Sequence, residues 1–323
     1  MSLFYFNMSH FTKRFSRLKN EEDTGFSATA TGRFLHKDGT PNVKRAGLNP
    51  LEKLSWYHTM IGLKSWKFIS ALILSYIIIN IIFALVYYAI GIEHLTGIDK
   101  SNWLNEFTDV FFFSSQTFTT VGYGRIAPVG FLASLVATFE AFLGLLTFAI
   151  ATGLFYGRFS RPRAFLKFSE NALIAPYKEG SALMFRLAPY KNNSLTDAHV
   201  ILIAAIGSKH NSQDPKEFFT LKTEISNINS LVLSWTVVHK IDEDSPFFEN
   251  IDDLMKEGEV ELFIQIRAFD EGFANTVVQR TSYVTKEIIN GAKFLPMFRP
   301  SENLQTTILD LDKINHFEKA VLK

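Results

Sequence analysis

The chain of 323 residues contains no cysteine, so disulfides and thiolate metal sites are excluded. It also lacks three enzyme signatures: the glycine-rich strand-to-helix turn of a dinucleotide site, a Walker loop and a His/Glu zinc motif. There is no internal repeat, and the first apolar residues are too few for a removable signal peptide. These absences predict a protein that is not an enzyme and needs no organic cofactor.

Charge is missing from two long stretches of the chain. Residues 68–90 contain no charged residue, and residues 129–157 contain only one. At the helical rise of about 1.5 Å per residue, each stretch is long enough to cross the hydrocarbon core of a bilayer. The sequence therefore predicts a first membrane span over residues 66–90 and a second over 129–157, with Gly144 and Gly153 as points where helices can approach closely or bend.

Lysine and arginine residues indicate the orientation of the two spans. Eleven lie before residue 68, where the uncharged stretch begins, whereas the loop between the spans holds only Lys100 and Arg125. Because cytoplasmic loops are enriched in these residues, we expect both termini to lie on the cytoplasmic side of the cell membrane, which the chain crosses twice.

Residues 105–118, between the spans, are too short to cross the bilayer and have a phenylalanine-rich helical pattern. They predict a half-helix that enters the membrane and turns back. The negative end of its helix dipole would point toward the ion path, where it favours a cation.

A short motif follows this half-helix: Thr119, Thr120, Val121, Gly122, Tyr123 and Gly124. The two glycines allow backbone angles that a side chain would forbid, so successive carbonyls can turn the same way, and Thr120 can add its hydroxyl at the innermost site. Such carbonyls, repeated in four chains around an axis, can replace the hydration shell of K⁺. The motif predicts a potassium pore, and the flanking spans argue against a simple turn between core helices.

Residues 50–64 have most of their apolar side chains on one side of a helix, with Lys53 and Lys64 elsewhere. This pattern favours an interfacial helix over residues 50–65 that lies along the inner leaflet. Trp66 and Lys67 then provide anchors at headgroup level. A soluble amphipathic helix packed on the cytoplasmic part is the open alternative.

The C-terminal half alternates in the manner of β-strands separated by turn sequences. An antiparallel sandwich is the expected outcome, and its scattered histidines are expected to be structural. The chain then divides into a cytoplasmic N-terminal segment (1–49), a pore module (50–157) and a cytoplasmic β domain (158–323). Residues 1–45 are expected to be loosely ordered unless the cytoplasmic part holds them. The strand-like segments are 172–176, 182–188, 199–206, 231–241, 260–269 and 274–284.

Three stretches outside the filter motif, 158–176, 194–203 and above all 234–248 (SWTVVHKIDEDSPFF), resemble prokaryotic inward-rectifier potassium channels. The resemblance runs from about residue 50 to about residue 300. It implies a homotetramer with a membrane α-helical pore module and cytoplasmic immunoglobulin-like β-sandwich domains. The lack of cysteine departs from animal members, whose outer loops carry a disulfide, and favours the bacterial branch.

The resemblance also implies roles for individual pore residues. The filter motif would bind K⁺, with Gln116 and Glu140 supporting it from behind; an acid within a span in any case suggests function, and a lipid-facing Glu140 is the less favoured alternative. Phe148 occupies the cavity position where strongly rectifying relatives place an acid, so strong voltage-dependent block is not expected. Tyr156 aligns with the bulky residue of the inner gate, which can close by excluding water, and Phe155 is the alternative.

On the cytoplasmic side, Asp197 matches an acid that lines the pore in relatives, whereas Arg267 falls where another acid often sits. The resemblance thus leaves room for weak block by polyamines or Mg²⁺, although Asp197 is equally interpretable as a solvated carboxylate. Basic residues near the inner surface suggest binding of anionic lipid headgroups, among them phosphoinositides. The enrichment of cationic residues on the cytoplasmic side of a membrane protein explains the same residues equally well. The residues of this predicted lipid site are Lys64, Trp66, Lys67, Arg158, Arg161, Arg163 and Lys167.

Two other functions are less consistent with the sequence than a conducting channel. A non-conducting membrane sensor is disfavoured because a disused loop has no physical need for two glycines in this pattern. A channel with a nucleotide-sensing domain is disfavoured because no βαβ glycine motif is present. No nucleic-acid partner is expected.

Overall fold

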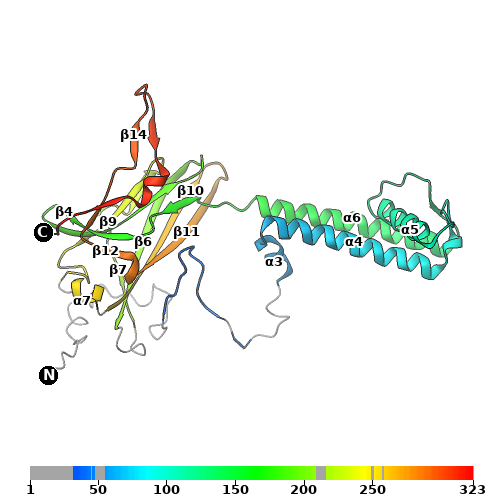
Figure 1. The fold of residues 1–323 in the computed structure, drawn as a ribbon, viewed down its shortest axis with the longest axis horizontal. Helices are drawn as coiled ribbons and strands as arrows, with labels where there is room; N and C mark the ends of the chain where they lie inside the picture. Colours follow the sequence, from blue (N-terminus) through cyan, green and yellow to red (C-terminus); the bar gives the residue numbers. More distant parts are fainter. Residues whose placement is uncertain are drawn as a thin grey trace. The chain divides into compact units, whose positions relative to one another are not determined.

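The computed structural model of the protein describes residues 32–44, 46–47, 55–208, 216–248, 251–256 and 258–322. The chain forms two compact units (Figure 1). One is Ala46–Arg161, and the other combines Met1–Arg45 with Pro162–Lys323. The first holds the predicted pore module, and the second holds the predicted β domain together with residues 32–44.

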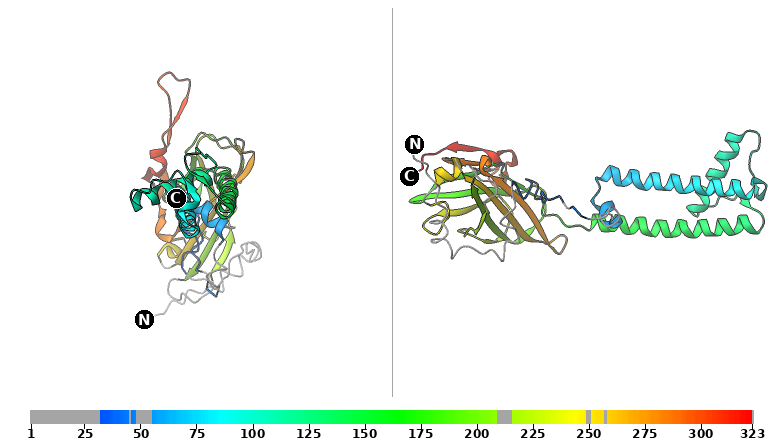
Figure 2. Two further views of the ribbon diagram at one scale, coloured as in Figure 1. Left: turned by 90° about the vertical axis from the view of Figure 1, so that its right-hand side faces the viewer. Right: turned by 90° about the horizontal axis from the view of Figure 1, so that it is seen from below.

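Two long apolar helices form the frame of the pore module. Helices α4 (Ser65–Ile90) and α6 (Phe131–Phe159) have mean hydropathies of 2.6 and 1.9 and are long enough to cross a membrane. They lie side by side, with α5 (Trp103–Phe118) at one end of the pair, as Figure 1 and Figure 2 show. Both spans occur within two residues of the predicted bounds.

Helix α5 begins two residues before its predicted start because Asn102 caps it. The Asn102 side chain accepts a hydrogen bond from the Leu104 N–H at 3.1 Å, which satisfies one of the free donors of the first turn. A short 3₁₀ turn, η1 (Ile92–His94), follows α4, and strands β1 (Leu95–Thr96) and β2 (Ala127–Pro128) pair across the loop. This pairing holds together the segments that precede α5 and follow the filter motif.

The predicted interfacial helix is shorter than expected. Helix α3 spans Trp56–Gly62, and the extended backbone of Leu63 and Lys64 separates it from α4. Residues 50–54 lie outside the described part of the chain. A Cβ on Gly157 of α6 would stand 2.6 Å from the Tyr57 hydroxyl, so α3 packs against the end of α6.

The β domain is a sandwich of two five-stranded sheets whose inner faces share one apolar core. Phe185 and Leu187 of one sheet meet Leu202 and Ile264 of the other in this core. One sheet has the order β11 (Asn275–Val284), β10 (Gly258–Asp270), β6 (Leu195–Ser208) and β7 (Glu217–Thr220), with β8 (Asn227–Ser230) on β6. The other has the order β12 (Ile288–Asn290), β4 (Ala172–Tyr177), β5 (Gly180–Pro189) and β3 (Leu166–Phe168), with β9 (Trp235–Ile241) on β5.

All six predicted strand segments overlap strands of this sandwich. The expectation of a purely antiparallel arrangement is wrong at one place, because β12 pairs with β4 in parallel. Strand β12 comes from the opposite sheet through the single turn η2 (Thr285–Glu287), and its direction is set by that crossing. The remaining elements are α7 (Ile251–Lys256), η3 (Leu311–Asn315) and the pairs β13 (Ala292–Phe294) with β16 (Phe317–Lys319) and β14 (Phe298–Pro300) with β15 (Thr307–Leu309).

The motif of residues 234–248 forms β9 and the turn after it. Every second residue of β9 points into the core, and among these is His239, which is 4% exposed. Its Nδ1–H donates to the Lys222 carbonyl at 2.7 Å, and its Nε2 accepts from the Ser245 hydroxyl at 2.8 Å. Burial lowers the pKa of His239 from its ordinary value of 6.5. This histidine is structural, as expected.

Candidate ion-conduction pore

The backbone of the filter motif alternates in handedness. Thr120, Gly122 and Gly124 have φ angles of 59°, 53° and 82°, whereas Val121 and Tyr123 between them stay in the usual negative range. This alternation makes successive carbonyls project to the same side of an extended segment, whereas successive carbonyls of a regular strand point to opposite sides. Glycine adopts a positive φ at little cost, and Thr120 adopts it against its preference.

The filter is held from below by the end of α5. The Gln116 carbonyl accepts the N–H groups of Val121 at 2.9 Å and Gly122 at 3.3 Å, and the Thr117 carbonyl accepts that of Thr120 at 3.0 Å. Gln116, a predicted support residue, therefore contacts the filter through its main chain.

Glu140 lies behind α5, where it joins all three helices of the pore. It is fully buried and accepts hydrogen bonds from Tyr87 of α4 at 2.7 Å and from Ser114 of α5 at 2.5 Å. A hydroxyl of Ser114 also lies 3.1 Å from Asn80, so the acid belongs to a satisfied network. Its described partners include no filter residue, and any support of the filter passes through α5.

The sequence did not predict one contact at the end of the filter motif. Arg125, immediately after the filter, forms an ion pair with Asp109 of α5, and Asp109 also accepts the Asp99 N–H at 2.9 Å. The pair connects the outer end of the filter to the pore helix. The position of Arg125, one of two cationic residues in this loop, was the available signal.

Phe148 and the start of the filter line the same cavity of about 540 Å³. Thr119 and Thr120 contribute to its wall, and Phe148 is 72% exposed in the single chain. The structure thus brings the predicted cavity residue next to the predicted innermost ion site, with no acid lining the space between them.

The two candidate gate residues have different surroundings. Phe155 packs edge-on against Phe68 with ring centroids 5.1 Å apart and stacks on Phe159 at 6.2 Å. Tyr156 is 75% exposed in the single chain. Phe155 is therefore committed to contacts within the subunit, and Tyr156 is free to face another surface.

Arg158, a predicted lipid-binding residue, is already engaged within the pore module. Its guanidinium donates to the carbonyls of Ile61 at 3.1 Å and Leu63 at 2.6 Å and to the Ser65 hydroxyl at 3.0 Å. It also lies over the Phe68 ring. These contacts fix the turn between α3 and α4 against the end of α6.

The other residues of the predicted lipid site are divided between the two units. Lys64, Trp66, Lys67 and Arg161 belong to the pore module and are exposed, and the Lys67 ammonium lies over the Trp66 ring. Arg163 and Lys167, also exposed, belong to the β unit.

Comparison with known proteins agrees with this geometry. Residues 75–161 match the ion channel family model, and residues 166–322 match that of the inward rectifier potassium channel C-terminal domain. Over 272 residues the chain is 34% identical to inward rectifier potassium channel Kirbac3.1 of Paramagnetospirillum magnetotacticum, which covers 82% of this chain and 89% of that protein. The chain belongs to the inward rectifier potassium channel family.

More distant relatives of this inward rectifier family member are animal channels. G protein-activated inward rectifier potassium channel 2 of Homo sapiens is 27% identical over 292 residues, covering 82% of this chain and 67% of its own length. G protein-activated inward rectifier potassium channel 4 of Mus musculus is 27% identical over the same length, with 68% of it covered. The relatives are ion channels rather than enzymes, and the two apolar helices fit a membrane location.

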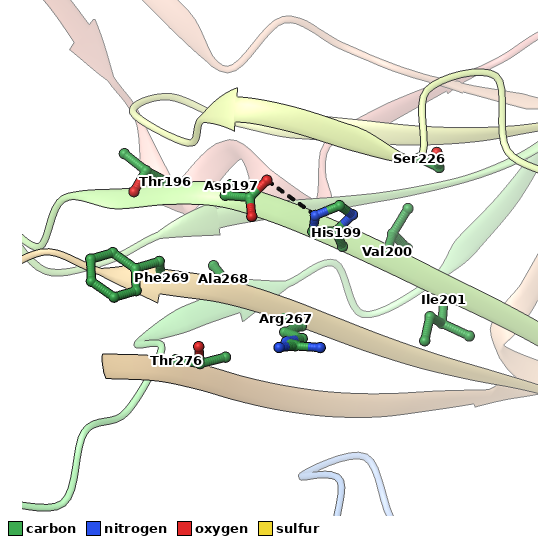
Figure 3. Close-up of a pocket in the computed structure, with 10 residues that line it drawn as sticks. All are labelled: Thr196, Asp197, His199, Val200, Ile201, Ser226, Arg267, Ala268, Phe269 and Thr276. Carbon is green, nitrogen blue, oxygen red and sulfur yellow. Dashed lines mark hydrogen bonds and ion pairs between the residues drawn. The ribbon is translucent and has the colours of Figure 1, made fainter. Parts of the chain in front are cut away.

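In this inward rectifier family member, Asp197 lies in a cavity of about 620 Å³ on the outer face of the sheet that contains β6 and β10 (Figure 3). Its backbone has a φ of 49°, opposite a bulge between Arg267 and Phe269. Its carboxylate lies 3.1 Å from His199 Nε2, and Arg267 lines the same cavity. The sequence did not predict the contact between Asp197 and His199.

Proposed function

We propose that this chain assembles as a homotetramer and conducts K⁺ selectively through residues 119–124. The observation that carries the proposal is the alternating handedness of Thr120, Gly122 and Gly124, which lines up carbonyls along a short path. Four such paths around an axis supply the oxygen cage that replaces the water of a K⁺ ion. The ion sites would be formed by oxygens of Thr120, Val121, Gly122 and Tyr123.

Exposure of the filter in a single chain supports the tetramer. Val121 is 52% exposed and Tyr123 is 80% exposed, although both belong to a segment flanked by apolar helices. A polar backbone left open at membrane depth is unfavourable unless other protein or a water-filled pore covers it. Three further copies would cover it and would complete the ion sites.

The proposed orientation places both termini in the cytoplasm, as the lysine and arginine distribution favours. Residues 1–49 and 158–323 then lie inside the cell and residues 50–157 form the pore module. A gate at the inner end of α6 would use Tyr156, since Phe155 is occupied within the subunit. Four tyrosine rings around an axis can close a pore by excluding water.

Anionic lipid headgroups are proposed to bind at Lys64, Lys67 and Arg161, which are exposed and cationic at the start of α4 and just after α6. Trp66 would anchor at the same depth. Arg158 acts differently, because its donors are used on the turn before α4. Arg163 and Lys167 remain predicted contributors.

Block by polyamines or Mg²⁺ is proposed to be weak. Phe148 supplies no charge in the cavity below the filter, and Asp197 shares its own cavity with His199 and Arg267. A multivalent cation near Asp197 would meet repulsion from Arg267.

Uptake of radioactive rubidium into liposomes that hold the purified protein tests the proposal. We expect uptake that barium blocks and a tetrameric mass by native mass spectrometry. Uptake that stays absent across anionic and neutral lipid compositions would favour a membrane sensor without conduction. A dimeric mass would contradict the filter assignment directly, since two chains cannot enclose the ion.

A further inference from the structure

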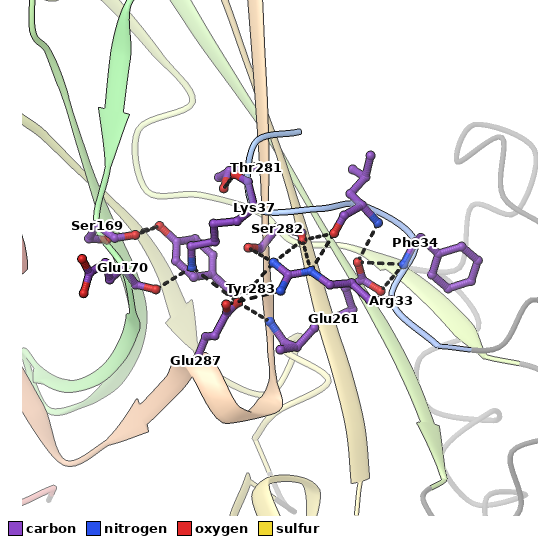
Figure 4. Close-up of polar contacts among 12 residues, drawn as sticks. Arg33, Phe34, Lys37, Ser169, Glu170, Glu261, Thr281, Ser282, Tyr283 and Glu287 are labelled. Carbon is purple, nitrogen blue, oxygen red and sulfur yellow. Dashed lines mark hydrogen bonds and ion pairs between the residues drawn. The ribbon is translucent and has the colours of Figure 1, made fainter. Parts of the chain in front are cut away.

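Residues 33–41, here called the strap, dock on the outer face of the sheet that contains β10 and β11 (Figure 4). The strap belongs to neither sheet, and its own bridge joins Leu35 to Pro41. Each described hydrogen bond between the strap and the β domain uses a side chain of at least one partner. The sandwich is therefore complete without the strap, which binds to it as a peptide ligand would.

A buried carboxylate receives the backbone of the strap. Glu261 of β10 is 1% exposed, and it accepts the Phe34 N–H at 2.9 Å and the Leu35 N–H at 3.1 Å. Burial raises the pKa of Glu261, while these N–H groups, Lys216 and Arg33 oppose the rise. Hydrogen bonds to an ionised acceptor are stronger than neutral ones, and a buried acid that loses them is costly.

Two basic residues hold the strap, one at its start and one at its middle. Arg33 donates to the Ser282 carbonyl at 3.1 Å and to Glu287 at 3.3 Å. Lys37 lies 3.4 Å from Glu287 and 3.9 Å from the centre of the Tyr283 ring. The acid of Glu287 thus accepts two cations that are four residues apart in the strap.

One aromatic side chain fills an apolar site between these two residues. The Phe34 ring lies 5.8 Å from the ring of Phe263 and 5.9 Å from that of Phe218, both edge-on. Leu35 beside it is 7% exposed. Together these contacts select a short extended segment with the order cation, aromatic, aliphatic, any residue, cation.

The far end of the strap is a turn pressed against β11. Gly39 has a φ of 79°, and a Cβ there would stand 2.3 Å from the Arg280 carbonyl oxygen. The Thr281 hydroxyl donates to the Lys37 carbonyl at 2.9 Å, next to the turn. Gly32, with the same φ of 79°, has no atom within 4 Å of its own Cβ position.

We propose that the groove around Glu261 and Glu287 is an exchangeable peptide-docking site whose occupant is the strap of this chain. Docking needs the negative charge of Glu261 and the close approach of Gly39 to β11. Every residue of the site belongs to the β unit, and none of them lies in the filter motif. Its release would free the chain that leads to α3.

Because the protein has no native cysteine, a single introduced thiol can report docking. Leu35→Cys places the reporter under the strap, and Ala172→Cys, at a core position of β4 with 0% exposure, is the matched control. The rate of maleimide labelling is measured by mass spectrometry on the full-length protein in detergent. We expect Glu261→Gln to raise the labelling rate of the Leu35→Cys reporter at least tenfold. The labelling rate of the Ala172→Cys control should stay unchanged.

A second pair of variants keeps the acid intact. Gly39→Ala is expected to speed labelling of the same reporter, and Gly32→Ala, which has equal backbone strain and open space, is expected to have no effect. A synthetic peptide of residues 32–44 should speed labelling with increasing concentration, whereas the peptide with Arg33→Glu should not.

Labelling at the wild-type rate in both Glu261→Gln and Gly39→Ala would overturn the proposal, as would failure of the peptide to compete. Equal acceleration at the reporter and at the core control would also overturn it, because loss of the whole sandwich would then explain the exposure.

Discussion

The carbonyl oxygen of Phe118 lies 1.7 Å from the position that a Cβ on Gly144 would occupy. Phe118 is the last residue of α5, and the filter motif follows it directly. Because Gly144 has no side chain, α6 can approach the end of α5 at a distance that any other residue at position 144 would prevent.

We expect Gly144→Ala to displace this end of α5, because a 1.7 Å approach cannot be relieved by a side-chain rotation. Overpacking of this kind typically costs about 1–3 kcal/mol, more than the roughly 1 kcal/mol of helix propensity that alanine adds. Thermal stability of the purified assembly and rubidium uptake should both fall. Gly153→Ala, in the same helix with no atom of the chain within 4 Å, is the control and should lower neither.

Gly122→Ala is expected to abolish the preference for K⁺ over Na⁺ while assembly persists. A Cβ at Gly122 meets no atom within 4 Å, so the effect comes from its φ of 53° alone. An alanine there would tend to leave the left-handed region and turn its carbonyl away from the ion path. Competition of Na⁺ against rubidium uptake measures the change, with Gly32→Ala as a control of like backbone; retained discrimination would contradict the filter assignment.

Tyr156→Ala is expected to raise basal flux several-fold, because it removes the ring proposed to exclude water at the gate. Phe155→Ala should instead lower the free energy of unfolding by about 3 kcal/mol or less, since it deletes the contacts with Phe68 and Phe159. Flux and melting temperature measured on both variants separate the two roles. Higher flux in Phe155→Ala alone would move the gate to that residue.

Arg158→Lys distinguishes a structural role from a lipid role. Lysine keeps the charge but cannot donate to Ile61, Leu63 and Ser65 together as the guanidinium does. We expect Arg158→Lys to lower the free energy of unfolding about as much as the uncharged variant Arg158→Gln does. The loss should be roughly 1 kcal/mol for each hydrogen bond removed. Full rescue by lysine in vesicles with anionic lipid would show that the charge is what matters.

The buried His239 predicts a loss of stability in acid. Its pKa is lowered by burial in the folded domain, so the unfolded chain binds the proton more readily. Stability should therefore be full above the ordinary pKa of 6.5 and fall as pH drops below it. Thermal unfolding between about pH 7.5 and about pH 5.5 measures this fall, and His239→Gln should flatten it; an equal slope in the variant would assign the dependence to other groups.

The membrane part was predictable because its signals are local. Absence of charge over a length that spans a bilayer and two glycines in a short motif can each be recognised in one continuous stretch of sequence. Strand positions were predictable for the same reason, since alternation shows which residues face the core. The parallel pairing of β12 with β4 was missed because it depends on where a turn carries the chain between sheets.

Residue partners were the least predictable feature. Arg158 and Arg163 are both cationic residues near the end of a span, and only the structure shows that Arg158 is committed to the carbonyls of Ile61 and Leu63. Likewise, the sequence left open whether the cytoplasmic part holds residues 1–45, and only the structure shows that Glu261, more than two hundred positions away, binds the backbone of Phe34.

The sequence by itself determined the family, the two candidate spans and the motif that we propose binds the ion, because each can be recognised in one continuous stretch of residues. The tertiary structure decided which charged groups are free and which are used: Arg158, Arg125 and Glu261 differ in role through partners brought together by folding. Charge is visible in a sequence, but the energy of a charge depends on what lies within a few ångströms of it, and that distance is set only by packing.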